Sequence, residues 1–79
     1  MEYYKNLSGN SGVVEYDLGP NHIKVRFSDG TIYLYTNSSA GFRHVQHMKS
    51  LARSGRGLSS FISTTVRQSY ARKERTPNR

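Results

Sequence analysis

The sequence feature that most constrains the fold is the dipeptide Asp29-Gly30, because it lies between two runs in which apolar and polar residues alternate. Such a dipeptide favours a two-residue turn with positive φ at both central positions. The flanking alternation therefore predicts a β-hairpin over residues 23–36. A two-residue turn also fixes the register of the two strands, and it would place Ser28 opposite Thr31.

The expected register sorts the hairpin side chains onto two faces of a sheet, because successive residues of a strand point in opposite directions. We expect the apolar face to be core: Ile23, Val25, Phe27, Ile32 and Leu34. The other face would combine two cations with two phenol rings: Lys24, Arg26, Tyr33 and Tyr35. Such rings can stack on unpaired bases while cations hold phosphates, but tyrosines also stabilise sheets or lie beneath helices without binding a ligand.

A further alternating segment, residues 13–18, predicts a strand that completes a three-stranded antiparallel meander with the hairpin. We expect its even-numbered residues to face the core: Val14, Tyr16 and Leu18. Its acidic residues Glu15 and Asp17 would then share the polar face with Lys24 and Arg26, where the opposite charges can pair.

Two amphipathic helices are predicted after the hairpin. Apolar residues recur every three to four positions over residues 40–54 and again over residues 58–72. Gly55 is well placed to end the first helix in the left-handed conformation. The predicted fold class is therefore α+β, with a three-stranded antiparallel meander followed by two helices packed on one face of the sheet.

The length of 79 residues predicts one domain, which we place at residues 13–72. Residues 1–12 would form a polar lead, and residues 73–79 a basic, disordered tail. The chain has no cysteine, which excludes disulfides and thiolate metal sites and fits a cytoplasmic protein. Its apolar runs are shorter than the ~18–20 residues that a membrane-spanning helix needs, so we expect no membrane contact.

Catalysis and metal binding find little support in the sequence. His44 and His47 lie three residues apart, but neither a cysteine nor a nearby acid would complete a metal site. A serine–histidine–acid arrangement or a pair of catalytic carboxylates is not recognisable. We therefore expect a protein that is not an enzyme, with no catalytic residues, no metal and no cofactor.

Positive charge is concentrated in the second half of the chain. The net charge is +7, yet residues 1–38 hold three basic and four acidic residues, whereas residues 39–79 hold nine basic residues and one acidic residue. This asymmetry favours a polyanionic partner, nucleic acid before an anionic membrane, although an ordinary solvated helix face would look the same. The cations that we expect to contact phosphates are Arg43, Lys49, Arg53, Arg56, Arg67, Arg72 and Lys73.

The segment Ser54-Gly55-Arg56-Gly57-Leu58 between the two helices allows two interpretations. Backbone N–H groups of a glycine-rich turn that enters a helix can point at a phosphate. Equally, the glycines can supply the unusual dihedral angles of a tight helix–helix connection. The spacing matches neither a P-loop nor a dinucleotide-binding fingerprint.

The order and spacing of several segments resemble the KTSC domain, a small bacterial domain that also occurs at the C-terminus of some lysyl-tRNA synthetases. The resemblance rests on Ser11-Gly12-Val13, Glu15-Tyr16-Asp17, Val25-Arg26-Phe27, the central Tyr33-Leu34-Tyr35, Gly55-Arg56-Gly57-Leu58, Phe61-Ile62 and Val66-Arg67. It covers most of the chain and implies no established activity, although RNA binding has been suggested for the family.

The leading functional prediction is a small monomeric module that binds RNA or another single-stranded nucleic acid. Arginine and lysine side chains would contact phosphates, and Tyr33 and Tyr35 would stack on bases if they are exposed. The second prediction is a protein-interaction or structural module with no nucleic-acid role. It would use an apolar or tyrosine-rich patch that includes Tyr3, Tyr4 and Tyr16. An accessory domain of an enzyme is the third prediction.

Overall fold

The computed structural model describes residues 1–9 and 11–75, and these form an α+β fold, as the sequence predicts. The strands are β1 (Glu2–Tyr3), β2 (Val13–Leu18), β3 (His22–Phe27), β4 (Thr31–Thr36) and β5 (Arg72–Arg75). The helical elements are α1 (Asn37–Ala40), α2 (Phe42–Ser54), α3 (Leu58–Phe61) and the π-helical turn η1 (Ile62–Val66).

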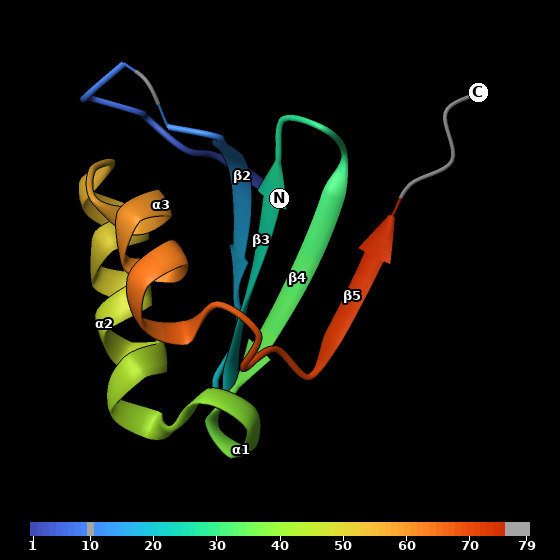
Figure 1. The fold of residues 1–79 in the computed structure, drawn as a ribbon. Helices are drawn as coiled ribbons and strands as arrows, with labels where there is room; N and C mark the ends of the chain where they lie inside the picture. The colour runs from blue at the N-terminus through green and yellow to red at the C-terminus, as the bar shows by residue number, and fades with distance from the viewer. Residues whose placement is uncertain (10, 76–79) are drawn as a thin grey trace.

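The five strands form one antiparallel sheet in the order β1-β2-β3-β4-β5, and α2 and α3 cover one of its faces (Figure 1). The predicted three-stranded meander is the middle of this sheet, β2 to β4. The sequence pattern does not predict the two edge strands, because β1 has two residues and β5 is a charged run without apolar alternation.

The chain after residue 66 differs from the prediction. The helical segment ends at Val66, and the chain returns to the sheet, where the Ala71 amide donates a hydrogen bond to the Leu34 carbonyl at 2.7 Å. Residues 72–75 then pair with β4 as strand β5. A helix that continues to residue 72 and a disordered tail that begins at residue 73 are therefore wrong. Residues 76–79 of that predicted tail lie outside the described residues.

The central hairpin is present, but its turn is longer than predicted. Three residues, 28–30, separate β3 from β4, and Arg26 lies opposite Ile32 rather than Tyr33. The Gly30 amide donates to the Phe27 carbonyl at 2.9 Å, and Gly30 itself has a φ of 91°. This is the pattern of a three-residue hairpin loop whose last residue is left-handed. The predicted register is therefore wrong by one residue.

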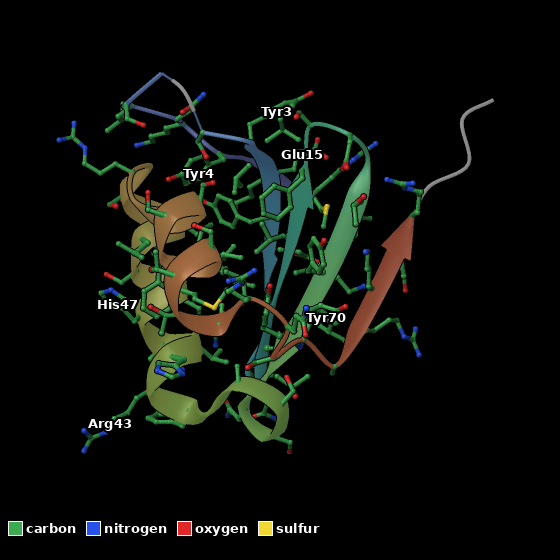
Figure 2. All side chains as sticks on the ribbon, viewed as in Figure 1. Tyr3, Tyr4, Glu15, Arg43, His47 and Tyr70 are labelled. Atoms are coloured by element: carbon green, nitrogen blue, oxygen red, sulfur yellow. The ribbon has the colours of Figure 1, made fainter. Side chains whose placement is uncertain are left out.

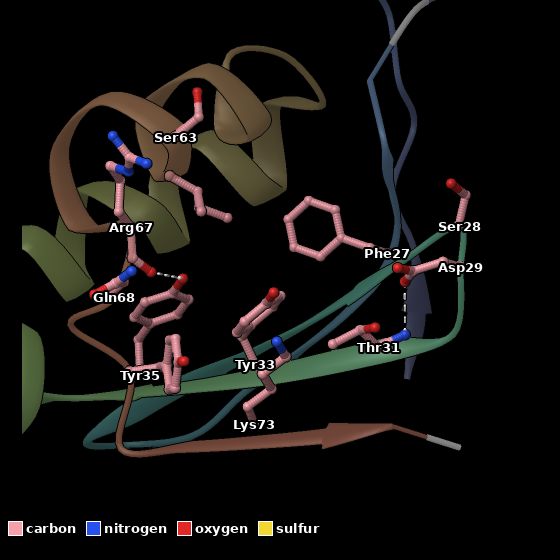
Figure 3. A pocket seen from close by; sticks show the side chains of 12 residues that line it. Phe27, Ser28, Asp29, Thr31, Tyr33, Tyr35, Ser63, Arg67, Gln68 and Lys73 are labelled. Carbon is pink, nitrogen blue, oxygen red and sulfur yellow. Dashed lines mark hydrogen bonds between the residues drawn. The ribbon is translucent and has the colours of Figure 1, made fainter. Parts of the chain in front are cut away.

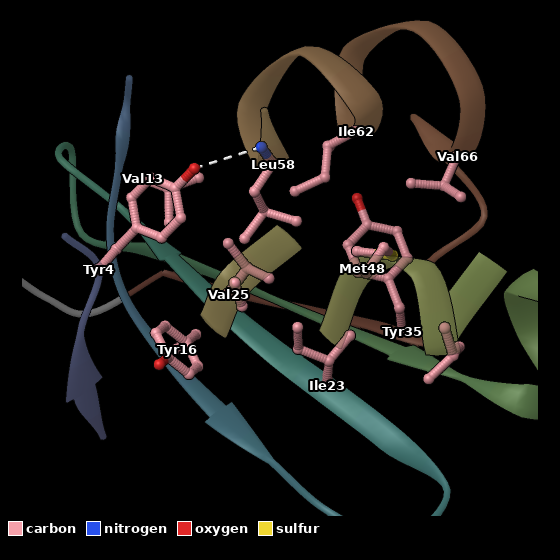
Figure 4. Close-up of a cluster of buried hydrophobic side chains, with 12 residues drawn as sticks. Tyr4, Val13, Tyr16, Ile23, Val25, Tyr35, Met48, Leu58, Ile62 and Val66 are labelled. Carbon is pink, nitrogen blue, oxygen red and sulfur yellow. Dashed lines mark hydrogen bonds between the residues drawn. The ribbon is translucent and has the colours of Figure 1, made fainter. Parts of the chain in front are cut away.

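The one-residue difference exchanges the two faces of β4, because the side-chain period of a strand is two. Tyr33 and Tyr35 join Ile23 and Val25 beneath the helices, and Tyr35 is completely buried (Figure 4). Ile32 and Leu34 move to the uncovered face of the sheet. The prediction that these two residues are core is wrong. The buried hydrophobic core consists of Tyr4, Val13, Tyr16, Ile23, Val25, Tyr35, Val45, Met48, Ala52, Leu58, Ile62 and Val66.

Strand β2 contains a bulge that changes which of its residues face the core. Its pairing with β3 shifts between Val13 and Glu15, so Val13 is buried and Val14 is exposed, the reverse of the prediction for Val14. Tyr16 is buried as predicted. The predicted pairing of acids and bases is also confirmed for one pair, because Glu15 accepts a hydrogen bond from Arg26 at 2.9 Å.

The helix ends follow local signals in the sequence. Thr36 caps α1 through a reciprocal pair of hydrogen bonds with Ser39. Gly55 ends α2 in the left-handed conformation, as predicted, with a φ of 80°. A Cβ at Gly55 would lie 2.7 Å from the Cβ of Lys5, so the close approach of the N-terminal segment also requires glycine here.

Candidate functional site

A cleft of about 440 Å³ lies between η1 and the strands β4 and β5 (Figure 3). Three groups of side chains line most of it, namely aromatic rings, cations, and the polar residues of the β3–β4 turn. They are Phe27, Tyr33, Tyr35 and Tyr70; Arg67 and Lys73; and Ser28, Asp29 and Thr31. The cleft exists because the chain leaves η1 and returns to the sheet edge as β5, which brings residues 67–73 beside the hairpin.

The aromatic side chains form one connected cluster around Tyr33. The centroid of the Tyr33 ring lies 5.5 Å from that of Phe27, 6.3 Å from that of Tyr35 and 5.1 Å from that of Tyr70. These separations lie within the range of favourable ring contacts, so the cluster holds its own geometry without a ligand. Tyr33 and Tyr70 are partly exposed, whereas Tyr35 is completely buried. Tyr35 therefore supports the cluster from below and offers no exposed ring on which a base could stack.

Tyr35 stays neutral at physiological pH. Burial, with smaller contributions from Tyr33 and Tyr70, raises the pKa of Tyr35 well above its ordinary value. Its hydroxyl donates a hydrogen bond to the backbone carbonyl of Arg67 at 3.0 Å.

Two cations border the exposed rings. The Lys73 ammonium lies 5.7 Å from the centroid of the Tyr33 ring, across the β4–β5 pairing. Arg67 is the residue directly after η1. It lies on the side of the cleft opposite Lys73, and it is exposed. A ligand in the cleft would therefore meet aromatic rings along its length and a cation on each side.

Asp29 gives one end of the cleft the opposite charge. Its Oδ1 atom accepts a hydrogen bond from the Thr31 amide at 2.9 Å, and its Oδ2 atom lies 3.6 Å from Arg75 Nη2. The Thr31 hydrogen bond is the main cause of a lowered pKa for Asp29, so the carboxylate is ionised at neutral pH.

The residues predicted to bind nucleic acid fall into two sets. Tyr33, Tyr35, Arg67 and Lys73 meet at the cleft. The other five lie outside its lining: Arg43, Lys49, Arg53, Arg56 and Arg72. Arg43, on α2, projects away from Tyr70 in Figure 2. Arg72 shares its strand with Lys73 but forms an ion pair with Glu74 at 3.3 Å.

Lys49 is not on the solvated helix face where the sequence pattern places it. The residue is buried, and its ammonium donates hydrogen bonds to the carbonyl oxygens of Gly19 at 2.5 Å and Pro20 at 3.3 Å. The cation therefore caps the β2–β3 turn, and the aliphatic stem of Lys49 is buried.

The glycine-rich turn after α2 fits the interpretation as a tight connection. Gly55 and Gly57 both have left-handed backbone angles. The amide of Leu58, the first residue of α3, donates to the hydroxyl of buried Tyr4 at 3.3 Å (Figure 4). This amide is therefore already engaged within the core, and Arg56 is exposed beside it.

Phe27, Asp29, Gln68 and Tyr70 also line the cleft, and sequence reasoning did not identify them as site residues. The sequence pattern placed Phe27 on the apolar face of the hairpin, and Phe27 is indeed packed against the core. The cleft depends on the path of residues 67–73, and the sequence pattern wrongly assigned most of this segment to a continuing helix.

The uncovered face of the sheet is a second, shallower surface. Basic and acidic residues are balanced on it, with Lys24, Arg26 and Arg72 against Glu15, Asp17 and Glu74. Tyr3 lies on the same face and is 81% exposed. This face therefore has apolar character but no excess of positive charge.

Metal ligands do not cluster in the described part of the chain, where no group of three histidine, cysteine or acidic side chains could hold an ion. His44 and His47 instead lie edge-on to the Phe61 ring, with centroids 5.8 and 4.7 Å away. Within the same residues, no helix has the length and apolarity required to cross a bilayer.

No known protein family, curated protein or solved structure matches the chain. The resemblance to the KTSC domain therefore stays a prediction.

Proposed function

We propose that the protein binds single-stranded nucleic acid, with RNA as the preferred form, through the cleft between η1 and strands β4 and β5. The observation that carries this proposal is the meeting of partly exposed rings, Tyr33 and Tyr70, with the cations Arg67 and Lys73 around one cleft. Rings of this kind stack on unpaired bases, and flanking cations neutralise phosphates.

The size of the cleft supports an unpaired nucleotide as the bound unit. Its volume of about 440 Å³ lies within the range of small-ligand pockets, and one nucleotide fits such a space. The bases of a duplex are stacked and paired, so they could not enter a recess walled by η1 on one side and the sheet on the other. Neighbouring nucleotides would follow the exposed basic residues of the surface.

The same proposal includes membership of the KTSC family, because the residues that carry the resemblance include Tyr33, Phe27 and Arg67 of the cleft. A partner of this kind would place the protein in the cytoplasm. The proposed role is binding and involves no catalytic residue or cofactor.

The decisive test compares two neighbouring cations of β5. Lys73 lies over the Tyr33 ring in the cleft, whereas Arg72 is paired with Leu34 on the uncovered face. Lys73→Glu and Arg72→Glu change the net charge of the protein by the same amount. We expect Lys73→Glu to weaken binding of a labelled five-nucleotide RNA by roughly tenfold and to lower the salt slope by about one. Arg72→Glu should have a much smaller effect.

Binding would be measured by fluorescence anisotropy over a series of salt concentrations, and the folded state of each variant by its NMR spectrum. Equal weakening by the two variants would mean that the RNA responds to overall charge and not to the cleft. If the wild-type protein does not bind RNA at low salt, the proposed function is wrong.

A protein-binding role is the second candidate, and the uncovered face of the sheet favours it. Tyr3 is highly exposed there, and Ile32 and Leu34 contribute apolar side chains. Docking through this balanced face would depend weakly on salt, whereas nucleic-acid binding through the cleft depends on it strongly.

A further inference from the structure

The two ends of the cleft differ in charge and in hydrogen-bonding character. The β3–β4 turn contributes the Asp29 carboxylate at one end, while Arg67 occupies the opposite end on the helical side (Figure 3). Phe27 and Tyr33 lie between them. A nucleotide has a matching polarity, because its phosphate is anionic and its base edge is neutral. Electrostatics would therefore orient the phosphate toward Arg67 and Lys73 and the base edge toward Asp29.

The Asp29 carboxylate is held in place and keeps the capacity to accept further hydrogen bonds. The Thr31 amide fixes Oδ1, and each carboxylate oxygen can accept more than one hydrogen bond. The contact of Oδ2 with Arg75 is long, at 3.6 Å, and the Arg75 side chain is 70% exposed, so a ligand can displace it at little cost. Figure 3 shows this carboxylate on the cleft side of the turn, beside Phe27.

An ionised carboxylate selects among bases by their hydrogen-bond donors. The Watson–Crick edge of guanine presents two adjacent donors, the N1–H and the 2-amino group, which match the two oxygens of a carboxylate. Adenine and cytosine each place a ring-nitrogen acceptor beside their amino group, and uracil flanks its single N–H with two carbonyl oxygens. Each of these acceptors would face the negative charge of Asp29.

We infer that the cleft selects guanine, with Asp29 accepting hydrogen bonds from the N1–H and 2-amino groups of the base. This inference rests on the proposed function and specifies the base that the cleft takes. A good bidentate contact of this kind discriminates against the wrong base by about tenfold or more.

The test measures the binding of three RNA pentamers that differ at their central base: UUGUU, UUAUU and the inosine form UUIUU. Inosine keeps the N1–H and lacks the 2-amino group, so its affinity should lie between those of the guanine and adenine pentamers. We expect the guanine pentamer to bind about tenfold more tightly than the adenine pentamer.

The variant Asp29→Asn supplies the matched comparison. Its side-chain oxygen can still accept the Thr31 amide, so the turn should be kept, and an NMR spectrum would verify this. In Asp29→Asn the guanine and adenine pentamers should bind within about twofold of each other, because the paired acceptors are lost. The adenine pentamer should not bind more weakly to this variant than to the wild-type protein.

The outcomes separate the two proposals. Equal affinities of the wild-type protein for all three pentamers would overturn guanine selection and leave the proposed binding of single strands standing. A guanine preference that survives in Asp29→Asn would also overturn the role of Asp29. If none of the pentamers binds at low salt, the proposed function fails, and guanine selection fails with it.

Discussion

The hydroxyl of Tyr35 donates a hydrogen bond to the backbone carbonyl of Arg67 at 3.0 Å, and this bond connects the centre of the core with the rim of the cleft. Tyr35 is completely buried, whereas Arg67 is exposed. The bond holds the chain at the point where it leaves η1 and turns toward β5. A residue that no ligand can reach therefore positions a cation that a ligand can contact.

Replacing this hydroxyl tests the connection directly. Tyr35→Phe should lower the free energy of unfolding by about 1 kcal/mol, because the variant leaves the Arg67 carbonyl without its donor. Urea denaturation would measure the change. Tyr3→Phe is the control, since Tyr3 is 81% exposed and its hydroxyl should contribute little. Equal stabilities of the two variants would contradict the structural role of the Tyr35 hydroxyl.

The stability of the protein should also fall at alkaline pH in a way that depends on Tyr35. Burial raises the pKa of Tyr35 in the folded state above its ordinary value of 10.0. Its contribution to stability is therefore complete below the pKa of the unfolded state and is lost as the pH rises toward the folded-state pKa, because the unfolded chain releases the proton first. Urea midpoints from about pH 9 to about pH 11 should fall more steeply for the wild-type protein than for Tyr35→Phe. Parallel curves would contradict this expectation.

Lys49 is expected to stabilise the fold rather than to bind RNA. Lys49→Met keeps the buried stem and removes the ammonium that donates to the Gly19 and Pro20 carbonyls. The free energy of unfolding should fall by roughly 1–2 kcal/mol, as expected for lost charge-assisted hydrogen bonds. Thermal unfolding would measure it, with Arg43→Met as the control on the exposed face of the same helix. A wild-type melting temperature for Lys49→Met would show that the turn does not depend on this cation.

Stacking in the cleft should depend on Tyr70. Tyr70→Ala should weaken RNA binding by about 1–3 kcal/mol, the usual contribution of one ring stacked on one base. Tyr3→Ala removes an exposed ring from the opposite face of the sheet and should leave the affinity unchanged. Fluorescence anisotropy would measure the affinity of each variant for RNA, and its NMR spectrum would show whether it is folded. If Tyr3→Ala weakened RNA binding more than Tyr70→Ala does, the RNA would bind to the uncovered face of the sheet and not to the cleft.

The hairpin shows how far sequence patterns reach. Asp29-Gly30 and the flanking alternation correctly predict two paired strands, but they leave the loop length open between two and three residues. In most hairpins the apolar pattern would resolve this choice. Here both faces of β4 are suitable for burial, since Ile32 and Leu34 alternate with Tyr33 and Tyr35, so either register gives an acceptable core.

The sequence predicted the residues of the site in part, but not their arrangement in space. The sequence pointed to Tyr33, Arg67 and Lys73 as binding residues, and these do line the cleft. It could not show that they lie together, because β5 pairs with β4 across more than thirty residues of chain and consists of charged residues without alternation. A strand of this kind forms where tertiary structure offers it a partner, and local propensity does not reveal it.

Strand β5 also affects how the protein behaves at high concentration. It ends the sheet on one side, and all four of its residues, Arg72 to Arg75, are charged and exposed. An open sheet edge allows the strands of other chains to add to it, and charged, solvated side chains along that edge oppose the addition. Strand β5 therefore has two effects: it brings Lys73 to the cleft, and its charged residues oppose edge-to-edge aggregation of the sheet.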